Sequence, residues 1–196
     1  NAEMENVSCL ETTATNANFT LANMQRAKFL GSNLSGSNLD SANLRKSIFL
    51  EANLSKCNLN EADLSNSDFS RTDMSHATIV ESNLSRGRFN GANLESVDFT
   101  DSRLSMAVFF EANFKNANLN RAQVKGAKLA GGTFENTSLP RADITGADLT
   151  DAKFLNSNLS RAKLSGAILR RTDLKGSDLS EADLSIADLT GASLIE

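Results

Sequence analysis

The sequence contains no tryptophan and no tyrosine, a single proline, a single histidine and two cysteines among its 196 residues. Without Trp and Tyr, the chain lacks two of the aromatic side chains that stack on nucleic-acid bases. A single histidine, His76, leaves no second one for a metal site or a nucleophile pair. No apolar run approaches the roughly 18 residues that a membrane span needs, so no membrane span is predicted.

A large apolar side chain recurs at every fifth position. In "ANLSKCNLNEADLSNSDF", residues 52–69, these positions are Leu54, Leu59, Leu64 and Phe69. Every fifth residue of an α-helix steps about 140° around the axis and forms no face. In a β-strand, an odd spacing sends successive residues to opposite sides. Neither an ordinary helix nor an ordinary strand explains the pattern.

The same register runs from residue 17 to the end of the chain. Counting in fives from Ala17, all 36 third positions, from Phe19 to Leu194, hold Leu, Phe, Met, Ile or Val. The first position is Ala 21 times and Ser 8 times, and its bulkiest occupant is Val97. Position two is mostly Asn or Asp, and positions four and five are mostly polar. A fixed internal period of this kind indicates a repeat architecture.

The sequence resembles the pentapeptide-repeat family, whose motif is A-(D/N)-L-x-x. The motif is visible in "GSDLSEADLSIADL", residues 176–189. The resemblance covers residues 17–196 without a break. It implies an all-β fold, a right-handed quadrilateral β-helix in which four pentads form one square coil of 20 residues. Positions one and three then point inward and the other three outward. About nine coils, at about 4.8 Å each, give a rod roughly 43 Å long.

Residues 20 apart test the four-pentad coil, because stacked coils place such residues above one another. Eight of the ten Phe residues at position three fall into two series with this spacing. The first series is Phe29, Phe49, Phe69, Phe89 and Phe109, and the second is Phe114, Phe134 and Phe154. Stacked aromatic pairs gain about 0.5–1.5 kcal/mol beyond their buried area. We therefore predict two aromatic ladders in the core.

Glycine and proline fit the same frame. Nine of the 11 glycines occupy position five, the predicted corner between two faces, where a turn calls for positive φ or a close backbone approach. Pro140 lies at position four, outside the core. A backbone that must donate hydrogen bonds to the next coil tolerates few prolines.

The two ends differ from the body of the chain. In residues 1–16 the pentads are degraded, and we interpret this segment as a cap coil or a leader, with a tag remnant at residues 1–2. Residues 17–196 are predicted to form one solenoid domain, because each coil contacts only its neighbours. The repeat stays in register to Leu194, and an uncapped end exposes apolar groups and backbone edges. A homodimer through the C-terminal coil, which the family resemblance implies, and a fragment of a longer protein are the two alternatives.

No catalytic, metal or cofactor site is predicted, and we do not expect an enzyme. The Asp residues at position two lie on successive faces and point apart, so they form no catalytic pair. Asn, Asp and Ser at these positions are expected to support turns through hydrogen bonds to nearby backbone. Cys57 occupies an inward small position and Cys9 a core position over two coils away, beyond the reach of a disulfide. Both are predicted to be free, structural thiols.

One outer face departs from the rule of Asn or Asp at position two. Its apolar residues at positions two and four are Leu30, Ile48, Leu50, Val108, Phe110 and Ile168. A contiguous exposed apolar patch with a polar rim is typical of a contact surface, whereas scattered apolar residues are normal. The face above the first Phe ladder is therefore the candidate partner-contact face, with mere drift of the repeat as the alternative.

A second surface feature is a candidate basic column, Arg121, Arg141 and Arg161. Such a column could follow phosphates, but the surface is mixed in charge, and nucleic-acid binding is not expected. The family resemblance also implies an alternative function, protection or inhibition of DNA gyrase by mimicry of duplex DNA. That mimicry needs an acidic rod. Residues 17–171 instead hold 15 acidic and 19 basic residues, a net charge of +4, and only residues 172–196, with 6 acidic and 1 basic, reach −5.

The preferred hypothesis is a non-enzymatic, rigid scaffold that presents side chains on a β-helical rod and binds another protein of unknown identity. It is free-standing or part of a larger protein, such as a bacterial effector or signalling protein. The chain is expected to be soluble and cytoplasmic, with a secreted effector as the alternative.

Overall fold

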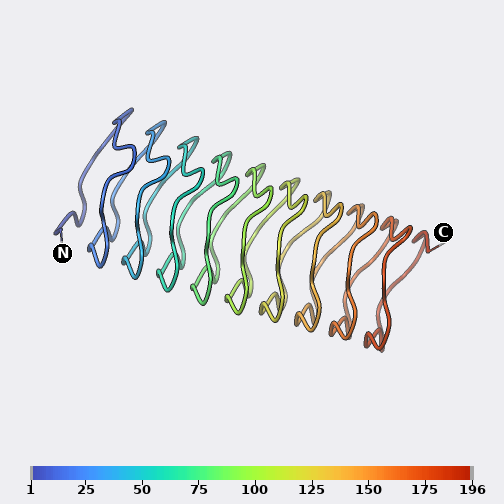
Figure 1. Cartoon of the computed structure of the whole chain (residues 1–196). Helices are drawn as coiled ribbons and strands as arrows, with labels where there is room; N and C mark the ends of the chain where they lie inside the picture. Colours follow the sequence, from blue (N-terminus) through green and yellow to red (C-terminus); the bar gives the residue numbers. More distant parts are fainter. Residues whose placement is uncertain (1, 195–196) are drawn as a thin grey trace.

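The computed structural model describes residues 2–194, which form one continuous β-helix with the two ends of the chain at opposite ends of the stack (Figure 1). The strand elements are single bridge residues separated by turns, and no helix occurs between residues 2 and 194. Each position-two residue forms a parallel bridge with the residue 20 further on, from Glu3–Asn23 to Asp173–Ser193. One coil therefore takes 20 residues, and the predicted quadrilateral β-helix is confirmed.

Four faces make up each coil. We number them by the pentads of one coil, with face 1 at residues 22–26, face 2 at 27–31, face 3 at 32–36 and face 4 at 37–41, and each face continues every 20 residues. Backbone hydrogen bonds join the coils at three positions of each pentad. On face 1, Asn43 N donates to Ala22 O at 2.9 Å, Leu44 N to Asp63 O at 2.8 Å, and Lys46 N to Ser65 O at 3.1 Å.

Every corner turns through a position-five residue in the left-handed region. Between Asn6 and Gly191, 29 non-glycine and nine glycine residues have φ from 50 to 73° at this position. The following N–H usually bonds to the carbonyl of position three, as in Ala42 N to Leu39 O at 3.0 Å, which is the pattern of a type II turn. Glycine thus occurs at the corners as predicted. Most corners nevertheless hold residues that resist positive φ, so the stacked backbone imposes the conformation.

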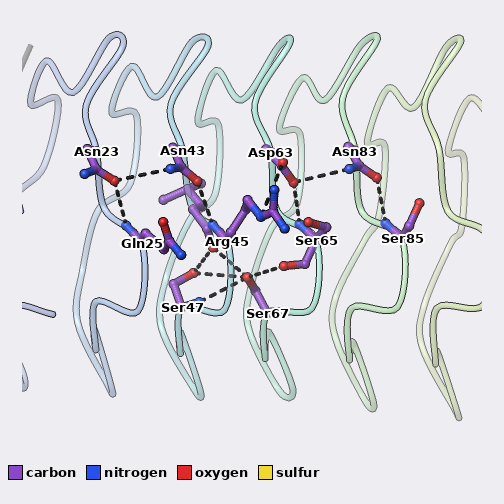
Figure 2. Close-up of polar contacts among 11 residues, drawn as sticks. Asn23, Gln25, Asn43, Arg45, Ser47, Asp63, Ser65, Ser67, Asn83 and Ser85 are labelled. Carbon is purple, nitrogen blue, oxygen red and sulfur yellow. Dashed lines mark hydrogen bonds and ion pairs between the residues drawn. The ribbon is translucent and has the colours of Figure 1, made fainter. Parts of the chain in front are cut away.

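Asn or Asp at position two satisfies the remaining backbone donor of the pentad. The side-chain Oδ1 of Asp63 accepts a hydrogen bond from Ser65 N at 3.0 Å (Figure 2). An Asn amide also reaches the coil before it, as Asn83 Nδ2 donates to Asp63 Oδ1 at 3.3 Å. The expected support of turns by these residues is confirmed. It explains why short amide and carboxylate side chains fill the position, since a buried or half-buried N–H without a partner is costly.

The two Phe ladders are confirmed. In the first ladder, on face 2, successive ring centroids lie 4.8–5.2 Å apart with interplanar angles of 16° or less. In the second, on face 3, the centroid spacings are 4.6 and 4.3 Å. The ladders meet where Phe109 and Phe114 lie 5.2 Å apart at a 60° angle. All eight rings are at most 1% exposed, so they belong wholly to the core.

Polar residues enter the core at position one because their hydroxyl groups find partners there. Ser102 Oγ donates to Ile79 O and accepts a hydrogen bond from Ser82 N at 3.1 Å. It bridges a corner whose N–H and carbonyl are not bonded to each other. Ser47 and Ser67, one coil apart on face 2, also bond to Leu44 O (Figure 2). Among residues 2–194, no buried side-chain N or O atom lacks a hydrogen-bond partner.

Burial decreases toward both ends of the stack. Position-three residues are fully buried from Met24 to Leu174, whereas Met4, Phe19 and Leu184 are only partly buried. Residues 2–16 follow the same coil geometry, since Glu3, Ser8 and Thr13 bridge to residues 23, 28 and 33. The tag remnant proposed at residues 1–2 includes Asn1, which lies outside the described residues. No helix long and apolar enough to cross a membrane occurs in the described part of the chain.

Candidate interaction surfaces

The six candidate contact residues all lie on face 2, but in separate groups along the rod. Leu30, Ile48 and Leu50 occupy neighbouring coils near the N-terminal end. Val108 and Phe110 lie three coils further on, and Ile168 another three coils beyond them. Phe110 is 43% exposed, whereas Val108 is half-buried because position two lies in the flat wall between stacked neighbours. The residues therefore do not form one continuous patch.

The first group contains a leucine that the sequence interpretation leaves out. Leu10, Leu30 and Leu50 occupy position four of three consecutive coils on face 2 and, with Glu11 and Glu51 among others, line a shallow groove of about 240 Å³. Leu10 is 59% exposed. Leu10 lies in residues 1–16, the segment that the sequence interpretation assigns to a cap or leader. Counting back 20 residues from Leu30 is the signal that identifies it.

Phe110 of the second group also lines a groove. Phe110 and Ala130 contribute its apolar side, and Glu111, Asp151 and Thr150 line the remainder of a groove of about 360 Å³. This groove lies at the same corner of face 2 as the leucine groove. Face 2 therefore carries two shallow grooves on one edge, each with apolar and acidic residues together.

The three arginines of the candidate basic column lie on the corner of face 4, and two of them are neutralised. Arg121 Nε donates to Asp101 Oδ1 at 2.7 Å, and this contact lowers the pKa of the Asp101 carboxyl. Arg161 donates two hydrogen bonds of 2.9 Å to Glu181, which lowers the pKa of Glu181. The salt bridges found among residues 2–194 do not include Arg141. The column is therefore a run of ion pairs around one arginine rather than a strip of free positive charge.

The sequence matches the family profile for pentapeptide repeats over residues 2–40, 17–49, 117–154 and 157–194. The profile of a pentapeptide repeat region matches residues 52–129. This chain belongs to the pentapeptide-repeat family. The profile consists of eight copies of the repeat, and in the structure each pentad forms one face of the coil.

Solved structures of other pentapeptide-repeat proteins resemble this one. HetL, a pentapeptide repeat protein involved in heterocyst differentiation regulation from the cyanobacterium Nostoc sp. strain PCC 7120, is 28% identical with a TM-score of 0.71, and the match covers 98% of this chain and 90% of HetL. QnrB1, a plasmid-mediated fluoroquinolone resistance protein, is 21% identical with a TM-score of 0.48, and the match covers 98% and 91%. Comparison with curated proteins gives no significant match. The likeness to HetL shows the fold.

A pentapeptide-repeat protein from the thylakoid lumen of Arabidopsis thaliana shares 32% identity over 48% of this chain and 66% of its own, with a TM-score of 0.47.

The remaining reactive side chains of this pentapeptide-repeat protein are isolated. Cys57 and Cys9 are free thiols. The Cys57 Sγ lies 3.1 Å from Leu34 O, and burial raises the pKa of its thiol to about 11. His76 is exposed at a corner. No group of three or more His, Cys, Asp or Glu residues is placed to hold a metal ion within the described range, 2–194.

Proposed function

We propose that this pentapeptide-repeat protein is a non-catalytic interaction rod that binds another protein through face 2. The observation that carries the proposal is the leucine groove, in which Leu10, Leu30 and Leu50 stack on an exterior that is otherwise mostly polar. Apolar side chains gathered in a groove with a charged rim are typical of protein contact sites. Phe110 adds an aromatic anchor to the same face, and partly exposed aromatics contribute strongly to interfaces.

The rigidity of the rod favours binding. Hydrogen bonds from three backbone positions of each pentad connect each coil to its neighbours. The outward side chains are therefore attached to a rigid backbone at fixed positions. A surface that is already ordered loses little conformational freedom when a partner binds, which leaves more of the interaction energy for affinity. The similarity to HetL, whose described role is in regulating heterocyst differentiation, supports a regulatory binding role over catalysis.

Surface substitutions on face 2 test the proposal. We expect the Leu30→Ser, Leu50→Ser double variant and the Val108→Ser, Phe110→Ser double variant to lose the partner that the unaltered protein captures from its host extract. The control is Leu21→Ser, because Leu21 is 55% exposed but lies on the corner of face 4. All three variants should keep the unfolding midpoint of the unaltered protein within a small margin. Capture that is unchanged in both face 2 variants would remove the proposal.

The surface charges do not favour the alternative of DNA mimicry. A DNA-like rod needs an array of free negative charges, whereas Asp101, Asp151 and Glu181 each pair with an arginine one coil away. The excess of acid is confined to the two ends, with three acidic and no basic residues in 1–16 and six acidic and one basic residue in 172–196. We therefore do not propose gyrase as the partner.

A further inference from the structure

The position-five residues at the corner of face 2, stacked one above another along the rod, form a corner column. The order of residue types in this column recurs after five coils. Its first part reads Glu11, Gly31, Glu51, Arg71, Gly91, and its second part reads Glu111, Gly131, Asp151, Arg171, Gly191. Each residue of the second part has the same type or charge as the residue 100 positions earlier. The other three corner columns match themselves at this spacing at no more than one position each. The repetition is therefore specific to the edge that carries both grooves.

The ion pairs of this column repeat with the sequence. Arg71 pairs with Glu51, with 2.6 Å between Nη2 and Oε1. Arg171 pairs with Asp151 in the same direction, one coil back, with 2.6 Å between Nη2 and Oδ2. Each pair fixes one carboxylate at the C-terminal side of a groove. The contact with Arg171 lowers the pKa of the Asp151 carboxyl, so this rim stays ionised at neutral pH.

The glycines at the middle of the two grooves leave a gap in the column. Gly31 and Gly131 have positive φ, but 29 other corners reach positive φ with a side chain, so backbone geometry does not demand glycine here. What glycine supplies is space. The Cγ atoms of Glu11 and Glu111 lie 3.6 and 3.3 Å from the positions that a Cβ at the two glycines would occupy. A Cβ would make an ordinary contact at Gly31 and a tight one at Gly131. Each groove thus has a narrow notch between two acidic residues, bordered by the stem of Glu11 or Glu111.

The free carboxylate of each groove is the one on its N-terminal side. Glu11 and Glu111 are exposed, and neither is part of the salt bridges found among residues 2–194. The notch beside each opens onto apolar side chains, the leucines of the first groove and Phe110 and Ala130 of the second. An apolar floor with one unpaired carboxylate at its rim is complementary to a side chain with an aliphatic stem and a cationic end.

We propose that the two grooves are sockets that each receive one basic side chain, arginine or lysine, from a single partner protein. This inference rests on the proposed function and specifies the chemistry of the partner. The stem of the basic side chain lies along the apolar floor, and its charged end enters the glycine notch beside Glu11 or Glu111. Five coils separate the sockets, which at about 4.8 Å per coil is about 24 Å. The partner is therefore expected to present two cations at that separation.

Two sockets on one rigid rod make the spacing measurable. A ligand that spans both sockets binds the second one intramolecularly, and its affinity rises only when its length matches the span. Polyproline rises about 3.1 Å per residue with three residues per turn, so two arginines separated by eight prolines lie about 28 Å apart on one side of the helix, and their long side chains cover the difference from the span. Two arginines separated by two prolines also lie on one side, but only about 9 Å apart, and cannot reach both sockets.

The experiment titrates these two peptides, and a third with glutamine in place of both arginines, into the ¹⁵N-labelled protein. We expect the longer arginine peptide to bind about tenfold more tightly than the shorter one, with chemical shift changes at Leu10, Leu30 and Ala130. The glutamine peptide should not bind. Equal affinities for the two arginine peptides, or shifts located elsewhere, would overturn the inference.

Filling the notches supplies the matched variants. Gly31→Gln and Gly131→Gln place a neutral side chain in each notch, and the double variant should lose about the tenfold advantage of the longer peptide. Gly146→Gln is the control, since it has the same corner conformation and no heavy atom within 4 Å of its Cβ position. If the double variant binds the longer peptide normally while the face 2 serine variants still lose their partner, the sockets are refuted and the proposed function stands. If the longer arginine peptide binds more tightly than the shorter one and only the notch variants remove this difference, the sockets are supported. This holds even if the face 2 serine variants still capture the partner.

Discussion

Leu104 and Leu184 occupy the same position of the same face, four coils apart, yet only one of them is fully buried. Leu104 is 0% exposed, because coils stack on both sides of it. Leu184 is partly buried, because only the coil before it contacts it within the described residues. Both residues stand in ordinary pentads, "SRLSM" and "ADLSI". The pentad determines which side chain points inward, and the neighbouring coils determine whether that side chain is fully buried.

The first coil leads to the same conclusion from a different sequence. Its position-three residues include Ala14, and Val7 stands at the small position, so its pattern is degraded where that of the last coil is regular. The inward residues of both terminal coils are nevertheless half-buried or, at Ala2 and Leu194, exposed. Adherence to the motif therefore does not determine burial at the ends of the rod.

The largest effect is expected from deleting core volume at the two matched leucines. Leu104→Ala removes a fully buried side chain that its neighbours cannot easily replace, and should lower the free energy of unfolding by about 2–5 kcal/mol. Leu184→Ala should cost less than half as much, because its side chain already contacts water. Urea unfolding followed by circular dichroism measures both values. Equal losses would show that burial along the stack does not control the energetics.

A smaller loss of stability is expected from removing serine hydroxyl groups at position one. Ser102→Ala removes the only hydroxyl that satisfies Ser82 N, whose corner lacks its own turn hydrogen bond, and an unpaired buried donor costs about 1–3 kcal/mol.

Ser177→Ala provides the comparison at the C-terminal end. Ser157 N bonds both Ser177 Oγ at 3.3 Å and Phe154 O at 3.3 Å, so the corner stays closed when the hydroxyl is lost. We expect a smaller loss of stability than at Ser102. The same urea titration decides the point, and a larger loss at Ser177 would contradict the bridging role assigned to Ser102.

The inward half of the structure was predictable from sequence because each pentad repeats the same physical requirement. A large residue at position three fills the core, and a small one at position one fits beside it. Residues 20 apart stack, so the contact between Phe29 and Phe49 follows from their spacing. The non-glycine corners could not be predicted this way. Local preference opposes positive φ at residues such as Ile186 or Arg71, and only the summed hydrogen bonds of stacked coils impose it.

The outer surface was predictable in its columns but not in its contacts. The sequence placed Phe110 and Leu50 on one face correctly, yet the grouping into two grooves depends on which residues line each corner. Arg121 and Arg141 are equivalent in the column pattern. Arg121 pairs with Asp101 because an acid happens to stand one coil away, whereas Arg141 has arginines on both sides. Whether an arginine forms an ion pair of this kind depends on the residue one coil away in the same column. A search for runs of like charge does not consider that residue.

The smallest effect is expected from lowering the pH. It should differ between the Asn-rich beginning of the rod and its Asp-rich end. Near the start, Asn18 and Asn33 accept hydrogen bonds from the N–H groups of Thr20 and Ser35. In the last coil, Asp183 and Asp188 play this role. Hydrogen bonds from Thr190 and Arg170 lower the pKa of Asp188 to about 2, and bonds from Ser185 lower the pKa of Asp183.

A lowered pKa in the folded state means that these carboxylates stabilise the last coil above the unfolded value near 3.9, and that the stabilisation is lost as the pH falls toward the folded value. As the pH falls from about 5 toward about 2, we expect the protection of the Ser185 amide against hydrogen exchange to decrease, after correction for intrinsic rates. Thr20 and Ser35 should keep their protection, because an asparagine amide does not titrate. Asp183→Asn should make Ser185 equally insensitive, since the amide oxygen can accept the same bond. An acid response at Ser185 that persists in this variant would assign the loosening to the exposed position of the coil rather than to its carboxylate.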